Sequence, residues 1–131
     1  MKELIKKAIE AKQNSYCPYS NFSVGAAALF EDNIIYSGCN IENASYGATN
    51  CAERTAIFNG VSKGNRKLKA IAIAGDSKDF TYPCGICRQV MLEFAESDDM
   101  MVYIVKNENE VLKIKIKDLI PGPFSKKDLG F

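Results

Sequence analysis

Histidine is the most consequential absence from this sequence, because none of the 131 residues is a histidine. Histidine is the commonest metal ligand in proteins and the side chain that titrates nearest to neutral pH. Its absence excludes every catalytic triad and every metal site that depends on an imidazole. General acid and base chemistry must therefore be carried out by carboxylates, tyrosine, cysteine or lysine.

Strong charge of one sign and long apolar runs are also missing. The 17 lysines and arginines nearly balance the 16 aspartates and glutamates, so the formal net charge is only +1. Proteins that bind nucleic acid need a broad positive field, so we expect a small, weakly charged ligand and no nucleic-acid partner. A membrane-spanning helix needs about 18 apolar residues in a row, and the sequence has no such run.

The cysteines and the N-terminal residues bear on the cellular location. Five cysteines are an odd number, which does not suit a framework of paired disulfides. The segment Met1–Lys7 interrupts its apolar residues with charges, unlike a signal peptide. We therefore expect a reducing, cytoplasmic location. We find no repeat, low-complexity tract or linker, and a chain of this length can form one core, so a single domain over residues 1–131 is expected.

Hydrophobic periodicity predicts helices that alternate with strands. The expected helices are the segment before Cys17, about Cys51–Ser62 and about Cys84–Glu96, and the expected strands are Ser23–Phe30, Ile34–Tyr36, Leu68–Ala74, Met101–Val105 and Val111–Lys117. This order predicts an α/β fold, in which helices cover the faces of a sheet.

Turn and capping residues set the expected boundaries of these elements. Asn50 lies three residues before Glu53, as in a capping box, and Gly64 is a typical residue to end the helix that begins there. We expect a loop over Asp76–Pro83. The segment Asp118–Phe124 contains two prolines and is expected to form no regular element.

Three cysteines and one glutamate form the most informative motif of the chain. Cys51-Ala52-Glu53 is followed by Pro83-Cys84-Gly85-Ile86-Cys87. Three thiolates can hold zinc and leave one tetrahedral position open for water, as in catalytic zinc sites. Glu53 lies two residues from the first ligand and is the obvious proton carrier. We therefore expect Cys51, Cys84 and Cys87 to bind zinc and Glu53 to be catalytic.

All three expected ligands lie at the starts of predicted helices, where free backbone N–H groups and the helix dipole lower the pKa of a thiol. Three thiolates around a dication still leave one negative charge, so such a site acidifies water less readily than a site with histidine ligands. Arg54 is next to Glu53 and could donate hydrogen bonds to the ligand sulfurs. The alternative for Arg54 is a solvated position on the helix surface.

Two other interpretations of the cysteines must be weighed. A Cys-x-x-Cys pair also occurs in redox dithiols, although this would leave Cys51 unexplained. A closed structural zinc site would need a fourth thiolate, which only Cys17 or Cys39 could supply. We expect these two cysteines to be small buried side chains instead, and we favour the catalytic interpretation.

With these residues established, the chain resembles the zinc-dependent nucleoside deaminases, and in particular the small homotetrameric cytidine deaminases. The deaminase signature combines His or Cys, any residue and Glu with a later Pro-Cys-x-x-Cys. Further matching segments are Cys17–Ala27, Asn40–Tyr46, Cys84–Gln89 and Leu119–Phe124, so the resemblance covers nearly the whole chain. It implies a three-layer α/β/α sandwich with a mixed central sheet of about five strands.

The resemblance also implies roles for single residues. Asn40 and Glu42 correspond to the pair that binds the ribose hydroxyls, and Phe22 to the aromatic ring that packs on the pyrimidine. The backbone of Ala52 and Cys84 would recognise the edge of the base. Tyr46 and Phe124 correspond to residues that neighbouring subunits contribute, so the resemblance implies a homotetramer with shared active sites and one zinc per subunit.

The implied reaction is the hydrolytic deamination of cytidine and 2′-deoxycytidine to the uridines, with release of ammonia, as in pyrimidine salvage. Blasticidin-type deaminases share the Cys-Ala-Glu and Pro-Cys-x-x-Cys core and are the nearest enzymatic alternative. A purine, free-base or polynucleotide deaminase is less favoured. The competing class is a non-catalytic interaction domain stabilised by zinc.

Overall fold

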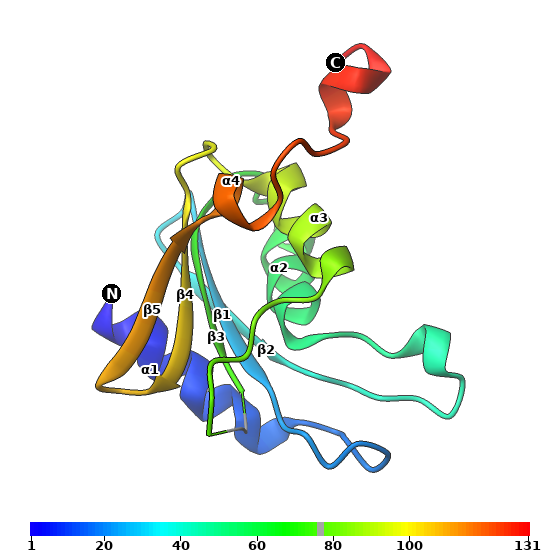
Figure 1. Cartoon of the computed structure of the whole chain (residues 1–131), viewed down its shortest axis with the longest axis vertical. Coiled ribbons are helices and arrows are strands. Elements are labelled where there is room, and N and C mark those ends of the chain that lie inside the picture. Colours follow the sequence, from blue (N-terminus) through cyan, green and yellow to red (C-terminus); the bar gives the residue numbers. More distant parts are fainter. Residues whose placement is uncertain (76–77) are drawn as a thin grey trace.

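A mixed five-stranded sheet forms the centre of the computed structural model, which describes residues 1–75 and 78–131 (Figure 1). The strands are β1 (Gly25–Phe30), β2 (Ile35–Cys39), β3 (Leu68–Ala74), β4 (Met101–Asn107) and β5 (Glu110–Lys115). Their order in the sheet is β2-β1-β3-β4-β5. Strands β3 and β4 pair in parallel, and the other neighbours pair antiparallel.

Helices cover both faces of the sheet (Figure 1). Helix α1 (Lys2–Ala11) packs on one face, α2 (Ala52–Ser62) and α3 (Gly85–Phe94) lie on the other, and a short α4 (Ile116–Leu119) follows β5. The described residues also form three short 3-10 helices: η1 (Lys12–Asn14), η2 (Tyr46–Ala48) and η3 (Lys126–Leu129). The expected three-layer α/β/α sandwich with a mixed sheet is therefore confirmed.

The sheet has one hydrophobic core on each face, because the side chains of its strands alternate between the two faces. In β3, Ile71 and Ile73 pack in the larger core beneath α2 and α3. Ala70, Ala72 and Ala74 point to the opposite face and pack with Leu4 and Ala8 of α1, because successive side chains of a strand alternate between faces. Strand β3 is thus buried on both faces, which accounts for its nearly continuous apolar sequence.

Close packing brings the start of α2 to the edge of the sheet. Gly38 of β2 has no side chain where α2 crosses it, and a Cβ built at this position would lie 2.5 Å from the nitrogen of Ala56. A side chain at residue 38 would therefore push the helix away. Beyond β2, Ile41 forms isolated bridges with Tyr16 and Asn50. These bridges hold the segment after β2 against the residues that precede α2.

Several predicted boundaries agree with the structure. The predicted strand Leu68–Ala74 coincides with β3, and the predicted first helix and second helix correspond to α1 and α2. Gly64 follows the end of α2 with a φ of +102°, the left-handed backbone that glycine adopts most easily. The first two residues of the predicted loop Asp76–Pro83 lie outside the described residues.

None of the described helices is long and apolar enough to cross a membrane.

Two local predictions are wrong. The N-cap of α2 is Cys51 rather than Asn50, and the Asn50 amide instead donates a hydrogen bond of 3.0 Å to the Thr55 hydroxyl. Strand β5 ends at Lys115, and α4 replaces the end of the predicted strand and the start of the predicted irregular tail. The helical turn buries both Ile116 and Leu119, which an extended chain would place on opposite faces.

Candidate metal centre and active site

The N-termini of α2 and α3 bring the three predicted ligands together. Cys51 is the N-cap of α2 and Cys84 is the N-cap of α3, and neither makes a side-chain capping bond. Cys87 lies in the first turn of α3. The three sulfur atoms all lie within 4.8 Å of one another. Both helices thus direct free N–H groups and positive dipole ends toward the sulfurs.

The spacing of the sulfurs fits a zinc ion. The Sγ atoms of Cys51 and Cys84 are 3.7 Å apart. Three thiolates at about 2.3 Å from one zinc, with tetrahedral angles between them, would stand about 3.8 Å apart. Cys87 is buried, Cys51 is half-buried and Cys84 is exposed, so the cluster is closed toward the core and open on the other side. The donor set and its geometry therefore suit a zinc site with one open position.

No fourth protein ligand joins the cluster within residues 1–75 and 78–131. Cys17 lies outside it, with its Sγ 3.6 Å from the Ser23 hydroxyl, and Cys39 also lies outside it. We expected both cysteines to be buried, but the structure shows that both are only half-buried. The structure therefore gives no support to a closed four-thiolate zinc module.

Hydrogen bonds within the cluster distribute its negative charge. The pKa of the Cys51 thiol is lowered to about 5, mainly by the hydrogen bond from Cys87 and further by Arg54. The pKa of Cys87 is raised, because its proton is held by Cys51 and because the thiol is buried. The guanidinium of Arg54 donates from Nη2 to the Cys51 sulfur at 3.4 Å. Arg54 therefore lies beside a ligand sulfur rather than on the outer surface of the helix.

Glu53 is a buried carboxyl at the edge of this cluster. Only 4% of the residue is exposed. Burial is the main cause that raises its pKa from 4.5 to about 7, and the neighbouring Cys51 thiolate raises it further. A group that titrates near neutral pH can both take up and release protons at low cost. Glu53 therefore has the environment of a general acid and base.

A cavity of about 260 Å³ opens beside Glu53 and the sulfurs. The starts of both ligand-bearing helices line it, through Cys51, Ala52, Glu53 and Cys84, and three further predicted residues do so as well: Phe22, Asn40 and Glu42. Residues from four separate segments of the sequence thus meet in one cavity. Its mainly apolar walls with a few polar groups are typical of a small-molecule site.

Glu42 is held in the cavity wall by the loop before β1. Its Oε1 accepts hydrogen bonds from the backbone N–H of Tyr19 at 2.9 Å and of Ser20 at 3.1 Å, and its Oε2 accepts one from the Ser20 hydroxyl. The Ser20 hydroxyl is the main cause that lowers the pKa of Glu42. The carboxylate is therefore ionised and oriented, and it can still accept bonds from hydroxyl groups of a ligand.

The side chain of Asn40 holds the backbone of the residues that lead into β1. Its Oδ1 accepts a hydrogen bond of 3.0 Å from the Val24 N–H, and its Nδ2 donates one of 2.7 Å to the Phe22 carbonyl. Asn40 is only 8% exposed. An amide can make about four hydrogen bonds, so it retains capacity toward the cavity while it holds the backbone of Phe22 in place.

Tyr46 and Phe124 do not line the cavity. Tyr46 is 76% exposed in η2, and its ring packs edge-on against Tyr19 with centroids 6.0 Å apart. Phe124 is 63% exposed on the C-terminal segment, which leads away from the sheet (Figure 1). Its carbonyl accepts a hydrogen bond of 2.8 Å from Gln89 of α3. Within the single chain Tyr46 stands beside the site, where it lines an adjoining hollow with Ser20, Glu42 and Thr49 of the cavity wall, whereas Phe124 stays apart from it.

Sequence reasoning missed part of the cavity wall. The additional lining residues are Ser20, Val24, Thr49, Asn50, Thr81 and Tyr82. Val24 lies in the predicted strand Ser23–Phe30 and Ser20 in the matching segment Cys17–Ala27, but nothing in the sequence indicated that the Ser20 hydroxyl would hold Glu42. Tyr82 lies two residues before the predicted ligand Cys84. This closeness was the one feature of the sequence that could have placed Tyr82 in the cavity wall beside α3.

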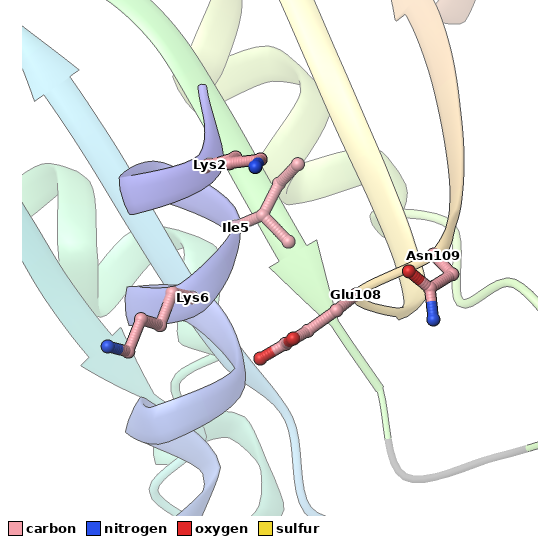
Figure 2. A pocket seen from close by; sticks show the side chains of 5 residues that line it. All are labelled: Lys2, Ile5, Lys6, Glu108 and Asn109. Atoms are coloured by element: carbon pink, nitrogen blue, oxygen red, sulfur yellow. The ribbon is translucent and has the colours of Figure 1, made fainter.

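A second hollow of about 290 Å³ lies far from the sulfurs, between α1 and the turn that joins β4 to β5 (Figure 2). Lys2, Ile5, Lys6, Glu108 and Asn109 line it, and Glu108 points toward α1. It is slightly larger than the cavity beside Glu53 but contains no thiol and no buried carboxyl. The chemistry of the chain therefore lies at the cysteine cluster and not in this hollow.

Comparison with known proteins agrees with this geometry. The family model of the cytidine and deoxycytidylate deaminase zinc-binding region matches residues 1–105. The chain belongs to this family. The matched region includes the three cysteines, Glu53 and every residue that lines the cavity, whereas Phe124 lies beyond it.

Individual relatives cover almost the whole chain. The cytidine deaminase of Sporosarcina psychrophila is 47% identical over 131 residues, which are 100% of this chain and 96% of that protein. The cytidine deaminase of Halalkalibacterium halodurans is 48% identical over 127 residues, 97% of this chain and 96% of that one. The crystal structure of cytidine deaminase from Burkholderia pseudomallei superposes with a TM-score of 0.87 at 43% identity, covering 93% of this chain and 97% of that one.

Proposed function

We propose that this protein catalyses the hydrolytic deamination of cytidine and 2′-deoxycytidine to uridine and 2′-deoxyuridine, with release of ammonia. The observation that carries the proposal is a buried carboxyl with a pKa of about 7, Glu53, beside a cluster of three cysteines that is open toward a cavity. The names of the similar proteins support the same substrate.

Each residue of the cluster has a defined task in this reaction. One zinc per subunit, held by Cys51, Cys84 and Cys87, would activate a water molecule for attack on C4 of the base. Glu53 would accept one proton from that water and deliver it to N3 of the base; after the C4–O bond forms, the same carboxyl would take the proton of the new C4 hydroxyl and pass it to the amine, which leaves as ammonia as the C4 carbonyl forms. Arg54 offsets the excess negative charge of three thiolates through its bond to the Cys51 sulfur.

The rest of the cavity suits a nucleoside. Glu42 and Asn40 bind the ribose hydroxyls, Phe22 packs against the pyrimidine, and the backbone of Ala52 and Cys84 recognises the edge of the base. Among the described residues that line the cavity there is no lysine or arginine. A phosphate group would find no cation there, so a neutral nucleoside is a better substrate than a nucleotide.

We further propose that residues 1–131 act as one catalytic domain in a cytoplasmic homotetramer, which serves pyrimidine salvage. Tyr46 and Phe124 complete the active sites of neighbouring subunits. Their exposure supports this assignment, because both rings are largely in water in the single chain. Burial of a large aromatic side chain contributes about 1.5 to 3 kcal/mol, so an interface would stabilise both.

The test of the reaction is a panel of nucleosides incubated with the purified, zinc-loaded protein. Cytidine and 2′-deoxycytidine should show the ultraviolet change of deamination, with one ammonia released per nucleoside. Adenosine, cytosine and 2′-deoxycytidine monophosphate should react far more slowly. Turnover of blasticidin S in place of cytidine would replace the substrate assignment, and no ammonia from any nucleoside would favour a non-catalytic zinc domain.

Shared active sites can be tested by mixing two inactive variants, Tyr46→Ala and Glu53→Gln. A site that takes Glu53 from one subunit and Tyr46 from its neighbour would be complete in a mixed oligomer. The mixture should therefore regain activity after subunit exchange. No recovery despite demonstrated exchange, or full activity of a monomer in sedimentation, would remove the tetramer proposal and leave the chemistry of the cluster intact.

A further inference from the structure

Arg88 is a half-buried arginine that no step of the proposed reaction uses. It follows Cys87 directly on α3, and its guanidinium donates two hydrogen bonds of 2.8 Å, from Nε to the Pro83 carbonyl and from Nη1 to the Leu119 carbonyl. Pro83 and Leu119 are both buried. In the part of the chain that the structure describes, no carboxylate forms an ion pair with Arg88. The guanidinium is thus held between two fixed backbone groups.

The Pro83 carbonyl belongs to the peptide that leads into a ligand. No described peptide bond is cis, and in a planar trans peptide the carbonyl and the following N–H point in opposite directions. Because Arg88 holds the carbonyl, the N–H of Cys84 must point away from Arg88. Cys84 lines the cavity, whereas Pro83 and Arg88 do not. The N–H therefore lies on the side of this peptide opposite Arg88 and belongs to a residue that lines the cavity.

We propose that Arg88 is a positioning residue, which fixes the plane of the Pro83–Cys84 peptide so that the Cys84 N–H faces the base and the Cys84 sulfur stays in the cluster. The inference rests on the proposed function, because it gives this N–H a ligand to recognise. A planar guanidinium can donate to two carbonyls at once from a fixed fork, whereas a lysine amine is a single flexible point charge.

Two substitutions separate this role from a role of charge alone. Arg88→Met removes the charge and both hydrogen bonds, and Arg88→Lys keeps the charge but loses the fork. Arg66→Met is the matched control, since Arg66 Nη1 also donates to two backbone carbonyls, those of Val61 at 3.0 Å and Asn65 at 2.8 Å, near the far end of α2. It removes similar bonds at a distance from the cavity.

The first readout is steady-state kinetics on cytidine with zinc-loaded proteins. The Cys84 N–H would bind the base in the ground state and in the transition state alike, so its displacement should raise KM by a larger factor than the disturbance of the Cys84 sulfur lowers kcat. We expect KM to rise about tenfold in both Arg88 variants, as for the loss of one well-placed hydrogen bond. Arg66→Met should keep wild-type KM and kcat.

The second readout does not depend on activity. The absorption bands of Co²⁺ substituted into the cluster report the arrangement of the three thiolates, and both Arg88 variants should shift them while Arg66→Met does not. Folded Arg88 variants with wild-type KM and wild-type cobalt spectra would overturn the proposal, and Arg88→Lys decides if Arg88→Met does not fold. If the wild-type protein fails to deaminate cytidine, the proposed function fails, and the cobalt spectra still test Arg88.

Discussion

Replacement of Glu53 by glutamine should remove a pH-dependent cost from the stability of the fold. Burial raises the pKa of Glu53 from 4.5 to about 7, so between these values the folded protein holds a proton that the unfolded chain has released. The stability linked to Glu53 is therefore fully present below pH 4.5 and is lost as the pH rises through about 7. This shift is that of the metal-free protein, in which the Cys51 thiolate adds to the effect of burial.

The size of the effect follows from the shift. One pKa unit corresponds to about 1.4 kcal/mol, so the whole shift is worth about 3 kcal/mol, of which about 2 kcal/mol falls between pH of about 5.5 and about 8.5. Glu53 is only 4% exposed, so solvent screens little of this energy. Glutamine has nearly the same shape and no charge, so the variant should lack the free-energy cost of ionising a buried carboxyl.

The assay is chemical denaturation of wild-type and Glu53→Gln protein at both pH values. The excess stability of the variant over wild type should grow by about 2 kcal/mol from the lower to the higher pH. Both proteins are measured free of metal, so linkage to metal binding does not enter this difference. Glu93→Gln, at an exposed position of α3, should show no such growth. A difference that is independent of pH, or that shrinks as pH rises, would refute the reasoning.

Three further predictions follow from the site and the core. Arg54→Ala should lower the turnover rate more than the zinc content, because its Nη2 lies 3.4 Å from the Cys51 sulfur, and unchanged kinetics would contradict its role in charge compensation. Metal analysis should find one zinc per chain near neutral pH and progressive loss as acid protonates the thiolates, and zinc retained in acid would contradict thiolate ligation. Gly60→Ala should cost about 1 to 3 kcal/mol of stability, because the added Cβ would lie 2.2 Å from a ring carbon of Phe30, and a chemical denaturation curve like that of wild type would contradict this packing.

Much of the fold could be predicted because its signals are local. The strand Leu68–Ala74 is a compact apolar run, and Gly64 follows the end of the helix before it. Neighbouring residues alone therefore predict both the strand and the end of the helix. Helix α4 was not predictable in this way. The alternation of β5 continues through Ile116 in the sequence, and the turn into a helix depends on the burial of Ile116 and Leu119 against the core, which is a tertiary effect.

The candidate site likewise combines features that the sequence predicts with contacts that depend on the tertiary structure. The spacing of the cysteines and Glu53 indicated one metal centre, and the structure brings their side chains together. The bonds of Ser20 to Glu42 and of Arg88 to Pro83 join residues that the sequence does not connect. The roles of Tyr46 and Phe124 stay predictions from resemblance: Tyr46 is exposed beside the cavity, where it lines a hollow with Glu42, and Phe124 is exposed on the C-terminal segment.

The most direct test of the central claim is the turnover of cytidine by Glu53→Gln with the zinc content measured on the same sample. The account predicts one zinc per chain, as in wild type, and a rate reduced by a factor on the order of 10² to 10⁴ or more, as expected for the loss of a general acid and base. Turnover near the wild-type rate by the zinc-loaded variant would contradict the assignment of Glu53 as the proton carrier.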